Sequence, residues 1–594
     1  MSSTRIRRAE GTRGIGVRCI LALLALTCAL ASLAGGQPAG DAEAVLQWND
    51  IDISQIPIEY HRRAVQLLGE MSGSELAPDW EGSPAIGQIV RPLYRPDVDG
   101  VAYYEFGVEG GGFIILSTGE HDYPIPHWDF TGQRLTDQLL GEARQSGMEV
   151  PAAYSFHKLD TLSYVLVSSE DEILAGGDDL PPLITGMDPR WLHERAQATE
   201  VEADGEGKRL ISGEPGSPVD LGEWASWKEL KEGYTLSYEV LLEALRVEAS
   251  EDWDIERAAA EVGEGLIPGD IHRVPFLFAG LGVERKWTAD GEGLDYVEIA
   301  EIHHRNSYPS LEIMVHKARP RAAPFEVHIE YYLGGELREE VLRFVVLDPT
   351  TVKGEPDDIA MVRPDQVLGP RLGVGLLNPG SWSQWHYFWA GSHIDQRLYG
   401  QFSQSGCISG CGAVAWAMLY GWIDHRACQG DANWIPRKWI YRVNAGKHPT
   451  PDACAPRNQD AGVRTMIWEI RNRLGSWCSS GATVPWDMVD GIYFLAGRSY
   501  GSVNTYYNPV GFALSGCRTR ARDHIIYKDT PAIIGTGFLS HYPLAYGYAW
   551  RSRKVGWWIF SYTQYSRWFY VNKGWYGSGN GWVSASTWFA GRFY

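Results

Sequence analysis

Three residues in the C-terminal part of the chain have types and an order that suit nucleophilic catalysis: Cys411, His541 and Asn572. Cys411 opens the mostly apolar stretch CGAVAWAMLYGWID, which predicts a helix that begins at the thiol. The positive end of a helix dipole favours the thiolate form of such a cysteine. A thiolate also needs a base that protonates the leaving amine, and that base needs a group that orients its ring. We expect His541 and Asn572 to take these two roles.

The neighbouring residues predict how the chain positions these side chains. Gly410 and Gly412 allow backbone and substrate to approach Cys411 closely, and the Cys411 backbone N–H is left to point at a developing oxyanion. His541 follows the strand-like run PAII and a Gly turn, and Asn572 ends a second strand-like run before a turn rich in Gly and Trp. Asn also suits such a turn for purely structural reasons, so a structural role for Asn572 stays open.

The cysteine count tests the hypothesis independently. Six cysteines lie in the last third of the chain: Cys407, Cys411, Cys428, Cys454, Cys478 and Cys517. If Cys411 is a catalytic thiol, the other five permit at most two disulfides and leave one thiol over, whereas pairing of all six would exclude catalysis. Cys407 lies in a loop before the predicted helix, and we expect it in a disulfide with Cys454 or another cysteine.

The first 34 residues have the pattern of a secretory signal peptide. Five Arg residues precede the apolar run CILALLALTCALASLA, and cleavage after Ala31 or Ala34 would fit its small residues. The alternative is an uncleaved anchor, because a run of about 17 residues is marginally long enough to span a bilayer. We expect a secreted protein, extracellular or periplasmic, that carries disulfides and has no stable membrane association.

Charge is divided unevenly between the two parts of the mature chain. Residues 35–370 hold 26 Lys and Arg against 63 Asp and Glu, and residues 371–594 hold 22 against 10. Two explanations fit: independent solubility charge, or an acidic N-terminal region that docks on the basic C-terminal segment. Nucleic-acid binding is not expected, because the basic segment carries no groove-reading motif.

Composition and periodicity predict four parts after the signal peptide. These are an α+β domain over residues 41–195, a linker rich in Glu, Gly, Ser and Pro over 196–219, an α+β domain of unknown role over 220–370, and a C-terminal domain over 371–594. Helices are expected within 45–75 and 237–262, the latter as one or two. Alternating runs predict antiparallel strands in both N-terminal domains, among them VAYYEFGV, FIILSTG, LSYVLVSS, VEIAEIHH, LEIMVHK, FEVHIEYYL and EVLRFVVL.

Other kinds of site find no support in the sequence. There is no HExxH helix, no paired CxxC spacing and no phosphate loop that ends in Lys-Ser or Lys-Thr, so we expect neither metal nor cofactor. The C-terminal domain holds 17 of the 25 Trp residues, which could form a carbohydrate-stacking platform. Core and groove lining is the more common use of such aromatic residues.

The chain order and local patterns resemble the papain superfamily, and most closely the streptopain-like peptidases. The matching segments are Gly410-Cys411 through Ala417, His541 through Gly547-Tyr548, and Asn572-Lys573-Gly574-Trp575. The resemblance implies a papain-like fold, in which the helix that bears the Cys packs on an antiparallel β-sheet, and a peptidase that forms a thioester acyl-enzyme.

The resemblance also implies supporting roles and a precursor form. Trp575 would shield the hydrogen bond between Asn572 and His541, and Gln404 would donate to the oxyanion, with Gln401 as the alternative. The sequence departs from the pattern at Tyr576, where the family often carries Gly, and the long spacing between His541 and Asn572 leaves room for a hairpin around WRSRKVGWWIFSYTQYSRW. Upstream, VEGGGFIILSTGEHDYPIPHWDFTG is similar to the family's propeptide, which implies an inhibitory N-terminal region.

Three hypotheses follow. The first is a secreted cysteine endopeptidase that acts on proteins or peptides. The second is a papain-fold amidase or transglutaminase-like enzyme with the same triad, and the third is a non-catalytic, aromatic-rich binding protein. For either enzyme we expect the Cys411 sulfur roughly 3–4 Å from a ring nitrogen of His541.

Overall fold

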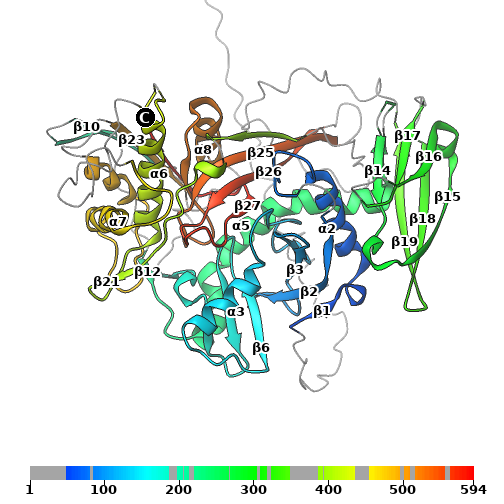
Figure 1. The fold of residues 1–594 in the computed structure, drawn as a ribbon, viewed down its shortest axis with the longest axis horizontal. Helices are drawn as coiled ribbons and strands as arrows, with labels where there is room; N and C mark the ends of the chain where they lie inside the picture. Colours follow the sequence, from blue (N-terminus) through cyan, green and yellow to red (C-terminus); the bar gives the residue numbers. More distant parts are fainter. Residues whose placement is uncertain are drawn as a thin grey trace, which may run out of the picture. The chain divides into compact units, whose positions relative to one another are not determined.

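The computed structural model has an α+β architecture, with one large mixed sheet, several smaller sheets and helices packed on them (Figure 1). It describes residues 49–80, 84–185, 197–204, 207–212, 220–266, 268–269, 271–303, 308–316, 323–347, 385–391, 393–431, 433–434, 454–495, 501–508, 516–555 and 562–594. The predicted signal peptide, residues 1–34, lies outside these residues. No helix in the described part of the chain is long and apolar enough to cross a membrane.

The N-terminal strands of the large sheet form antiparallel hairpins, with one parallel pairing between β2 and β6. The elements are β1 (Ile51–Asp52), α2 (Ile58–Met71), β2 (Ile86–Tyr94), β3 (Tyr103–Val108), β4 (Phe113–Ser117), β5 (His127–Asp129), α3 (Leu135–Gln145), β6 (Tyr154–Lys158), β7 (Tyr164–Ser168) and β8 (Ile173–Ala175). The helix predicted within residues 45–75 is thus confirmed as α2. The alternating runs form β3, β4 and β7 as expected.

A glycine fixes the turn between β3 and β4. Gly112 has a φ of 95°, and an added Cβ would lie 2.4 Å from the carbonyl oxygen of Asp129. Only glycine tolerates both this conformation and this contact. The Gly-rich segment therefore brings β4 next to β5, with which it pairs.

The stretch predicted to be a linker contains regular structure. β10 (Gln197–Asp204) and β11 (Gly207–Ser212) pair with each other, and β10 also pairs antiparallel with β23 (Gly501–Tyr507) of the C-terminal part. Alternation of polar and apolar residues in QATEVEAD suits a strand, but the many Glu, Gly and Ser residues of the stretch indicated a linker. β9 (Leu183–Thr185) precedes this hairpin in the chain and β12 (Asp220–Gly222) follows it. These two strands pair with each other in a separate two-stranded sheet.

One helix, not two, follows. α5 (Trp227–Val262) runs for 36 residues and is the longest helix described (Figure 1). After it come a four-stranded sheet and a three-stranded sheet, which include the four strands predicted for this region. Their strands are β13 (Glu264–Leu266), β14 (Ile271–Pro275), β15 (Glu284–Asp290), β16 (Val297–Ile302), β17 (Ser310–Val315), β18 (Ala323–Leu333) and β19 (Glu336–Val346).

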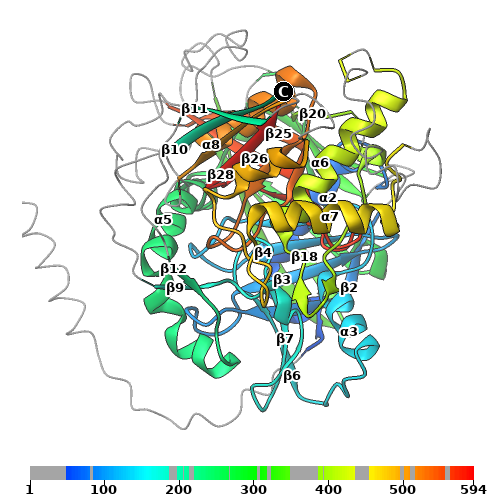
Figure 2. The same cartoon turned by 90° about the vertical axis from the view of Figure 1, so that its left-hand side faces the viewer.

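Within the described residues, the C-terminal part combines three α-helices with strands of the large sheet and with the short β21–β22 hairpin. Its elements are β20 (His386–Trp389), β21 (Ser403–Gln404), β22 (Cys407–Ile408), α6 (Cys411–Cys428), α7 (Ala461–Leu474), β23, α8 (Gly516–Lys528), β24 (Ala532–Gly535), β25 (Leu544–Val555), β26 (Tyr562–Asn572), β27 (Gly581–Ser584) and β28 (Phe589–Phe593). α6 packs against α7 and against β24 and β25 of the sheet (Figure 2). The predicted hairpin between His541 and Asn572 is confirmed as the β25–β26 pair.

The N-terminal and C-terminal parts share the large sheet. β5 pairs antiparallel with β27, so that Trp128 lies opposite Trp582. The Trp128 ring stacks on Trp80 and Trp582 with centroids 5.4 and 5.9 Å away, and its edge meets Trp568 at 5.5 Å. All four rings are buried. Residues 48–594 accordingly form one compact unit, in which main-chain bonds and a tryptophan cluster join the two parts.

Candidate active site

Cys411 is the first residue of the buried helix α6, as the sequence predicts. The preceding Gly410 has a φ of 83°, and a Cβ at this position would lie 2.0 Å from the carbonyl oxygen of Gly481. This close approach requires glycine, and it fixes where the helix begins. Cys411 is 9% exposed, so the thiol lies just below the surface at the positive end of the helix dipole.

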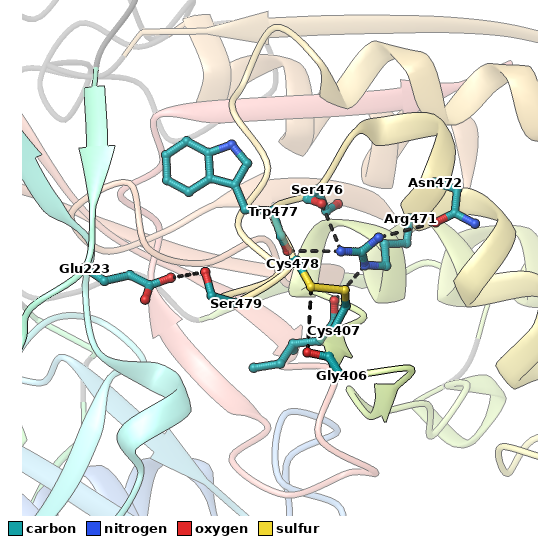
Figure 3. Close-up of a disulfide and its surroundings, with 10 residues drawn as sticks. Glu223, Gly406, Cys407, Arg471, Asn472, Ser476, Trp477, Cys478 and Ser479 are labelled. Atoms are coloured by element: carbon teal, nitrogen blue, oxygen red, sulfur yellow. Dashed lines mark hydrogen bonds between the residues drawn. A yellow bond between two sulfur atoms is a disulfide. The ribbon is translucent and has the colours of Figure 1, made fainter.

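The segment before Cys411 is held at two points (Figure 3). A disulfide joins Cys407 to Cys478, and the backbone N–H of Ile408 donates to the Cys478 carbonyl at 2.9 Å. The Arg471 guanidinium donates to the carbonyls of Ile408 and Ser476 at 2.7 and 3.0 Å, so it binds both sides of the disulfide. These contacts hold the backbone that leads into the helix, and with it the Cys411 N–H.

Gln404, the predicted oxyanion donor, lies on this segment. It pairs with Cys407 in the short β21–β22 hairpin, and its side chain is exposed to solvent. The alternative, Gln401, accepts a hydrogen bond at its carbonyl from the Tyr576 hydroxyl at 2.9 Å. Tyr576 has a φ of 56°, a conformation that favours glycine.

The cysteines divide as a catalytic thiol requires. Disulfides join Cys407 to Cys478 and Cys428 to Cys454, while Cys411 and Cys517 lie outside both. Cys407 therefore forms a disulfide, as expected, with Cys478 as its partner. Cys517 is fully buried and burial raises its pKa far above the ordinary value of a thiol, so we expect it not to react. Two disulfides indicate folding outside the reducing cytoplasm.

His541 lies in the loop between β24 and β25, where its backbone forms a bridge with Thr536. The ring is 5% exposed, and its Nε2–H donates to the carbonyl of Lys573 at 2.6 Å. Because a carbonyl only accepts, the neutral ring carries its proton on Nε2 and its lone pair on Nδ1. The His541 pKa is lowered to about 4, mainly by burial and also by the Lys573 charge, while the hydrogen bond to the Lys573 carbonyl and the Asp160 carboxylate act in the opposite direction.

Asn572 makes a different set of contacts from the predicted one. Its fully buried amide donates to the carbonyl of Arg397 at 3.1 Å and to Gln396 Oε1 at 3.4 Å, and its Oδ1 accepts from the Gly574 N–H at 3.0 Å. The side chain thus shapes the turn after β26. The ring nitrogen that we expected to meet Asn572 meets the main-chain carbonyl of Lys573, one residue along.

The three predicted residues are brought to one region of the molecule. A Cβ at Gly574 would lie 3.0 Å from Val414 Cγ1, so the turn after Asn572 packs against the first turn of α6. Val414 is three residues after Cys411 and shares its side of the helix. Because His541 is bonded to Lys573 in the same turn, the imidazole and the helix start are held by one junction. The sulfur-to-ring separation of roughly 3–4 Å stays a prediction.

Trp575 follows this turn and is partly exposed. The Lys573 ammonium lies 5.7 Å from the centroid of its ring, and its backbone bridges to Gly400. Its contact with Lys573 places the indole beside the residue whose carbonyl holds His541. Shielding of that hydrogen bond by Trp575 stays a prediction.

Three groups that contribute to the site were not predicted from the sequence. They are the Lys573 carbonyl, the Arg471 clamp and Asp160, which accepts a hydrogen bond from Ser540 at 2.7 Å next to His541. A main-chain carbonyl carries no sequence signal, and Arg471 and Asp160 are distant in sequence from the residues they hold. Only the fold reveals them.

No group of three or more His, Cys, Asp or Glu side chains within the described ranges could hold a metal ion. Comparison of the chain with protein-family models, with curated proteins and with solved structures finds no match in any of the three.

Proposed function

We propose that this protein is a secreted cysteine peptidase with a papain-like C-terminal part, in which Cys411 is the nucleophile and His541 the base. One observation carries the proposal. A thiol outside both disulfides opens a buried helix against which the turn that holds His541 packs. Helix start, histidine and asparagine occur in the chain order of the streptopain-like peptidases.

The proposed reaction uses the two nitrogens of His541 differently. Nδ1 accepts the proton of the Cys411 thiol, and the thiolate attacks the carbonyl carbon of the peptide bond. The tetrahedral intermediate collapses when the imidazolium gives its proton to the amine, which leaves and yields a thioester on Cys411. Water, deprotonated by the same nitrogen, then attacks the thioester and releases the acid and the thiol. The Nε2–H remains bonded to the Lys573 carbonyl throughout and keeps the ring in this tautomer.

The oxyanion would meet the backbone N–H of Cys411 and the amide of Gln404. The first donor is provided by the helix start, whose N–H groups lack partners within the helix. The second would reach over from the hairpin that the Cys407–Cys478 disulfide anchors.

We further propose that the full chain is a precursor whose acidic N-terminal region limits access to Cys411. Cys411 and His541 are 9% and 5% exposed. The N-terminal carboxylate Glu223 also accepts a hydrogen bond at 2.7 Å from Ser479, in the loop whose Gly481 packs against Gly410. Such a cover would be displaced by processing, and peptide-sized substrates would then reach the thiol.

The test is to label the full-length protein with an epoxysuccinyl probe, before and after limited proteolysis, and to map the modified residue by mass. We expect modification of Cys411 that rises after proteolysis, with Cys411→Ser as the negative control and Cys517→Ser as the matched variant that still reacts. Absence of label on Cys411 in the processed protein would support the non-catalytic binding protein. Label without peptide hydrolysis would support the amidase or transglutaminase-like enzyme.

A further inference from the structure

A carboxylate from the N-terminal part lies against the loop that carries His541. Asp160, in the turn between β6 and β7, is 3% exposed and accepts the Ser540 hydroxyl at its Oδ2 at 2.7 Å. Its Oδ1 accepts from the backbone N–H groups of Leu162 and Ser163 at 3.1 and 3.0 Å. Both oxygens therefore have partners, one in the Asp160 turn itself and one in the histidine loop.

The Asp160 turn is rigidly supported from the N-terminal side. The Lys158 ammonium is fully buried, donates to the Asp160 carbonyl at 2.8 Å and forms an ion pair with Asp122 at 2.9 Å. The same ammonium lies 4.7 Å from the centre of the Tyr103 ring. Because a buried charge is costly to move away from such partners, the position of Asp160 is well defined.

The histidine loop is shaped to receive this carboxylate. Gly537 has a φ of 67°, and a Cβ there would lie 2.5 Å from Asp160 Oδ2, so no larger residue fits beside the carboxylate. One residue later, the Phe538 ring stacks on Tyr238 of α5 with centroids 4.8 Å apart. The loop that ends at His541 is thus held by the N-terminal part at Ser540 and at Phe538.

We propose that Asp160 is a positioning residue for His541, supplied by the N-terminal part of the chain to the site in the C-terminal part. It holds the histidine loop through Ser540, and its negative charge favours the imidazolium that forms when His541 accepts the thiol proton. This inference rests on the proposed peptidase function and goes beyond it. It makes the N-terminal part necessary for catalysis, even though the same part covers the site in the precursor.

The charge state of the His541 ring depends on the groups that face it. Lys573 disfavours the imidazolium, and burial does so more strongly, whereas the Asp160 carboxylate and the Lys573 carbonyl favour it. The adjacent Tyr542 is neutral, because burial raises its pKa well above the ordinary value. Asp160 is therefore the negative charge that offsets the Lys573 charge at this ring. Activation has to displace the cover and leave the β6–β7 turn in place.

The test compares Asp160→Asn, Ser540→Ala and the control Asp171→Asn, each expressed as the full chain and then processed by limited proteolysis. Asp171 is an acid of the same N-terminal part whose carboxylate pairs with the exposed Lys231. Asp160→Asn keeps the shape of the side chain but removes its charge, so the imidazolium becomes less stable. The alkaline limb of the pH profile of kcat/KM should therefore move to lower pH by roughly half to one unit. Alkylation of Cys411 at neutral pH should become about threefold to tenfold slower. Ser540→Ala should lower kcat several-fold with the limb in place, and Asp171→Asn should behave as wild type.

Two failures have different signatures. A wild-type enzyme whose Cys411 neither reacts nor hydrolyses peptides would overturn the proposed function. An active wild-type enzyme whose alkaline limb is unchanged by Asp160→Asn, or whose kcat is unchanged by Ser540→Ala, would overturn this inference. If Asp160→Asn is too unstable to purify, the milder Ser540→Ala variant decides through kcat.

Discussion

Replacing Gly410 by alanine should misplace the nucleophile more than it unfolds the protein. The added Cβ would lie 2.0 Å from the Gly481 carbonyl oxygen, whereas an ordinary contact between non-bonded heavy atoms is about 3.5 Å. The backbone on one side has to move by more than about 1 Å, and a displacement of that size at a reacting group costs on the order of 10²-fold in rate. Because φ and ψ are 83° and 148°, a region nearly confined to glycine, strain adds roughly 1–3 kcal/mol of destabilisation.

Gly430 provides the matched control. It follows the other end of α6 with a φ of 88°, and a Cβ there would meet nothing within 4 Å. Gly430→Ala should therefore cost about 1–2 kcal/mol through its backbone conformation and leave the thiol in place. The assay is the rate of Cys411 alkylation by iodoacetamide in the processed protein, with the urea midpoint of each variant as the measure of stability.

The contrast between the two variants is what the structure predicts. Alkylation of Gly410→Ala should fall by about tenfold or more, in the direction of the 10²-fold limit, while Gly430→Ala reacts at the wild-type rate. Equal alkylation rates in the two variants would refute the view that the Gly410–Gly481 contact positions Cys411.

Three further perturbations have defined outcomes. Asn572→Ala should lower the free energy of unfolding by roughly 2–3 kcal/mol in a denaturant titration, because a fully buried amide loses its partners, and should slow catalysis less than His541→Ala does; loss of activity without loss of stability would restore Asn572 as the orienting group. Replacing Cys407 and Cys478 together by serine should lower the free energy of unfolding by about 4 kcal/mol, since the disulfide joins residues 71 positions apart, and should slow alkylation of Cys411. Alkylation at the wild-type rate would show that the disulfide is not needed to position the thiol. Burial raises the pKa of Asp129 to about 8, so the folded state binds its proton more tightly than the unfolded state and stability should fall as pH rises from about 4 to 8; Asp129→Asn should flatten this slope, and an unchanged slope would contradict the assignment.

Local features of the chain predicted the elements that carry the site. The small-residue turn at Gly410 followed by an apolar run gave the start of α6 to the residue, because both signals are local to the helix end. The cysteine arithmetic succeeded in the same way, since two disulfides left Cys411 outside. Strand alternation located the β3–β4 hairpin, and the long spacing between His541 and Asn572 predicted the β25–β26 hairpin; in both, the paired strands are close in sequence.

Long-range pairings were beyond these signals. β5 and β27 are more than 400 residues apart, and nothing in either short strand identifies the other. Residues 197–204, within the expected linker, form β10 because they pair with β23 of the large sheet. This tertiary pairing overrides the polar composition of the segment. At the site, the Lys573 carbonyl took the position expected for the Asn572 side chain, and a backbone group cannot be chosen from residue types.

Activation of the Cys411 thiol by His541 is tested most directly by the pH dependence of Cys411 alkylation in the protein and its His541→Ala variant, both expressed as the full chain and then processed. We expect the wild-type thiol to react at pH 6, well below the ordinary thiol pKa, and the reaction at this pH to slow by at least about tenfold in His541→Ala, while the buried Cys517 stays unmodified in both. A Cys411 that reacts only above about pH 8, equally in both proteins, would contradict it.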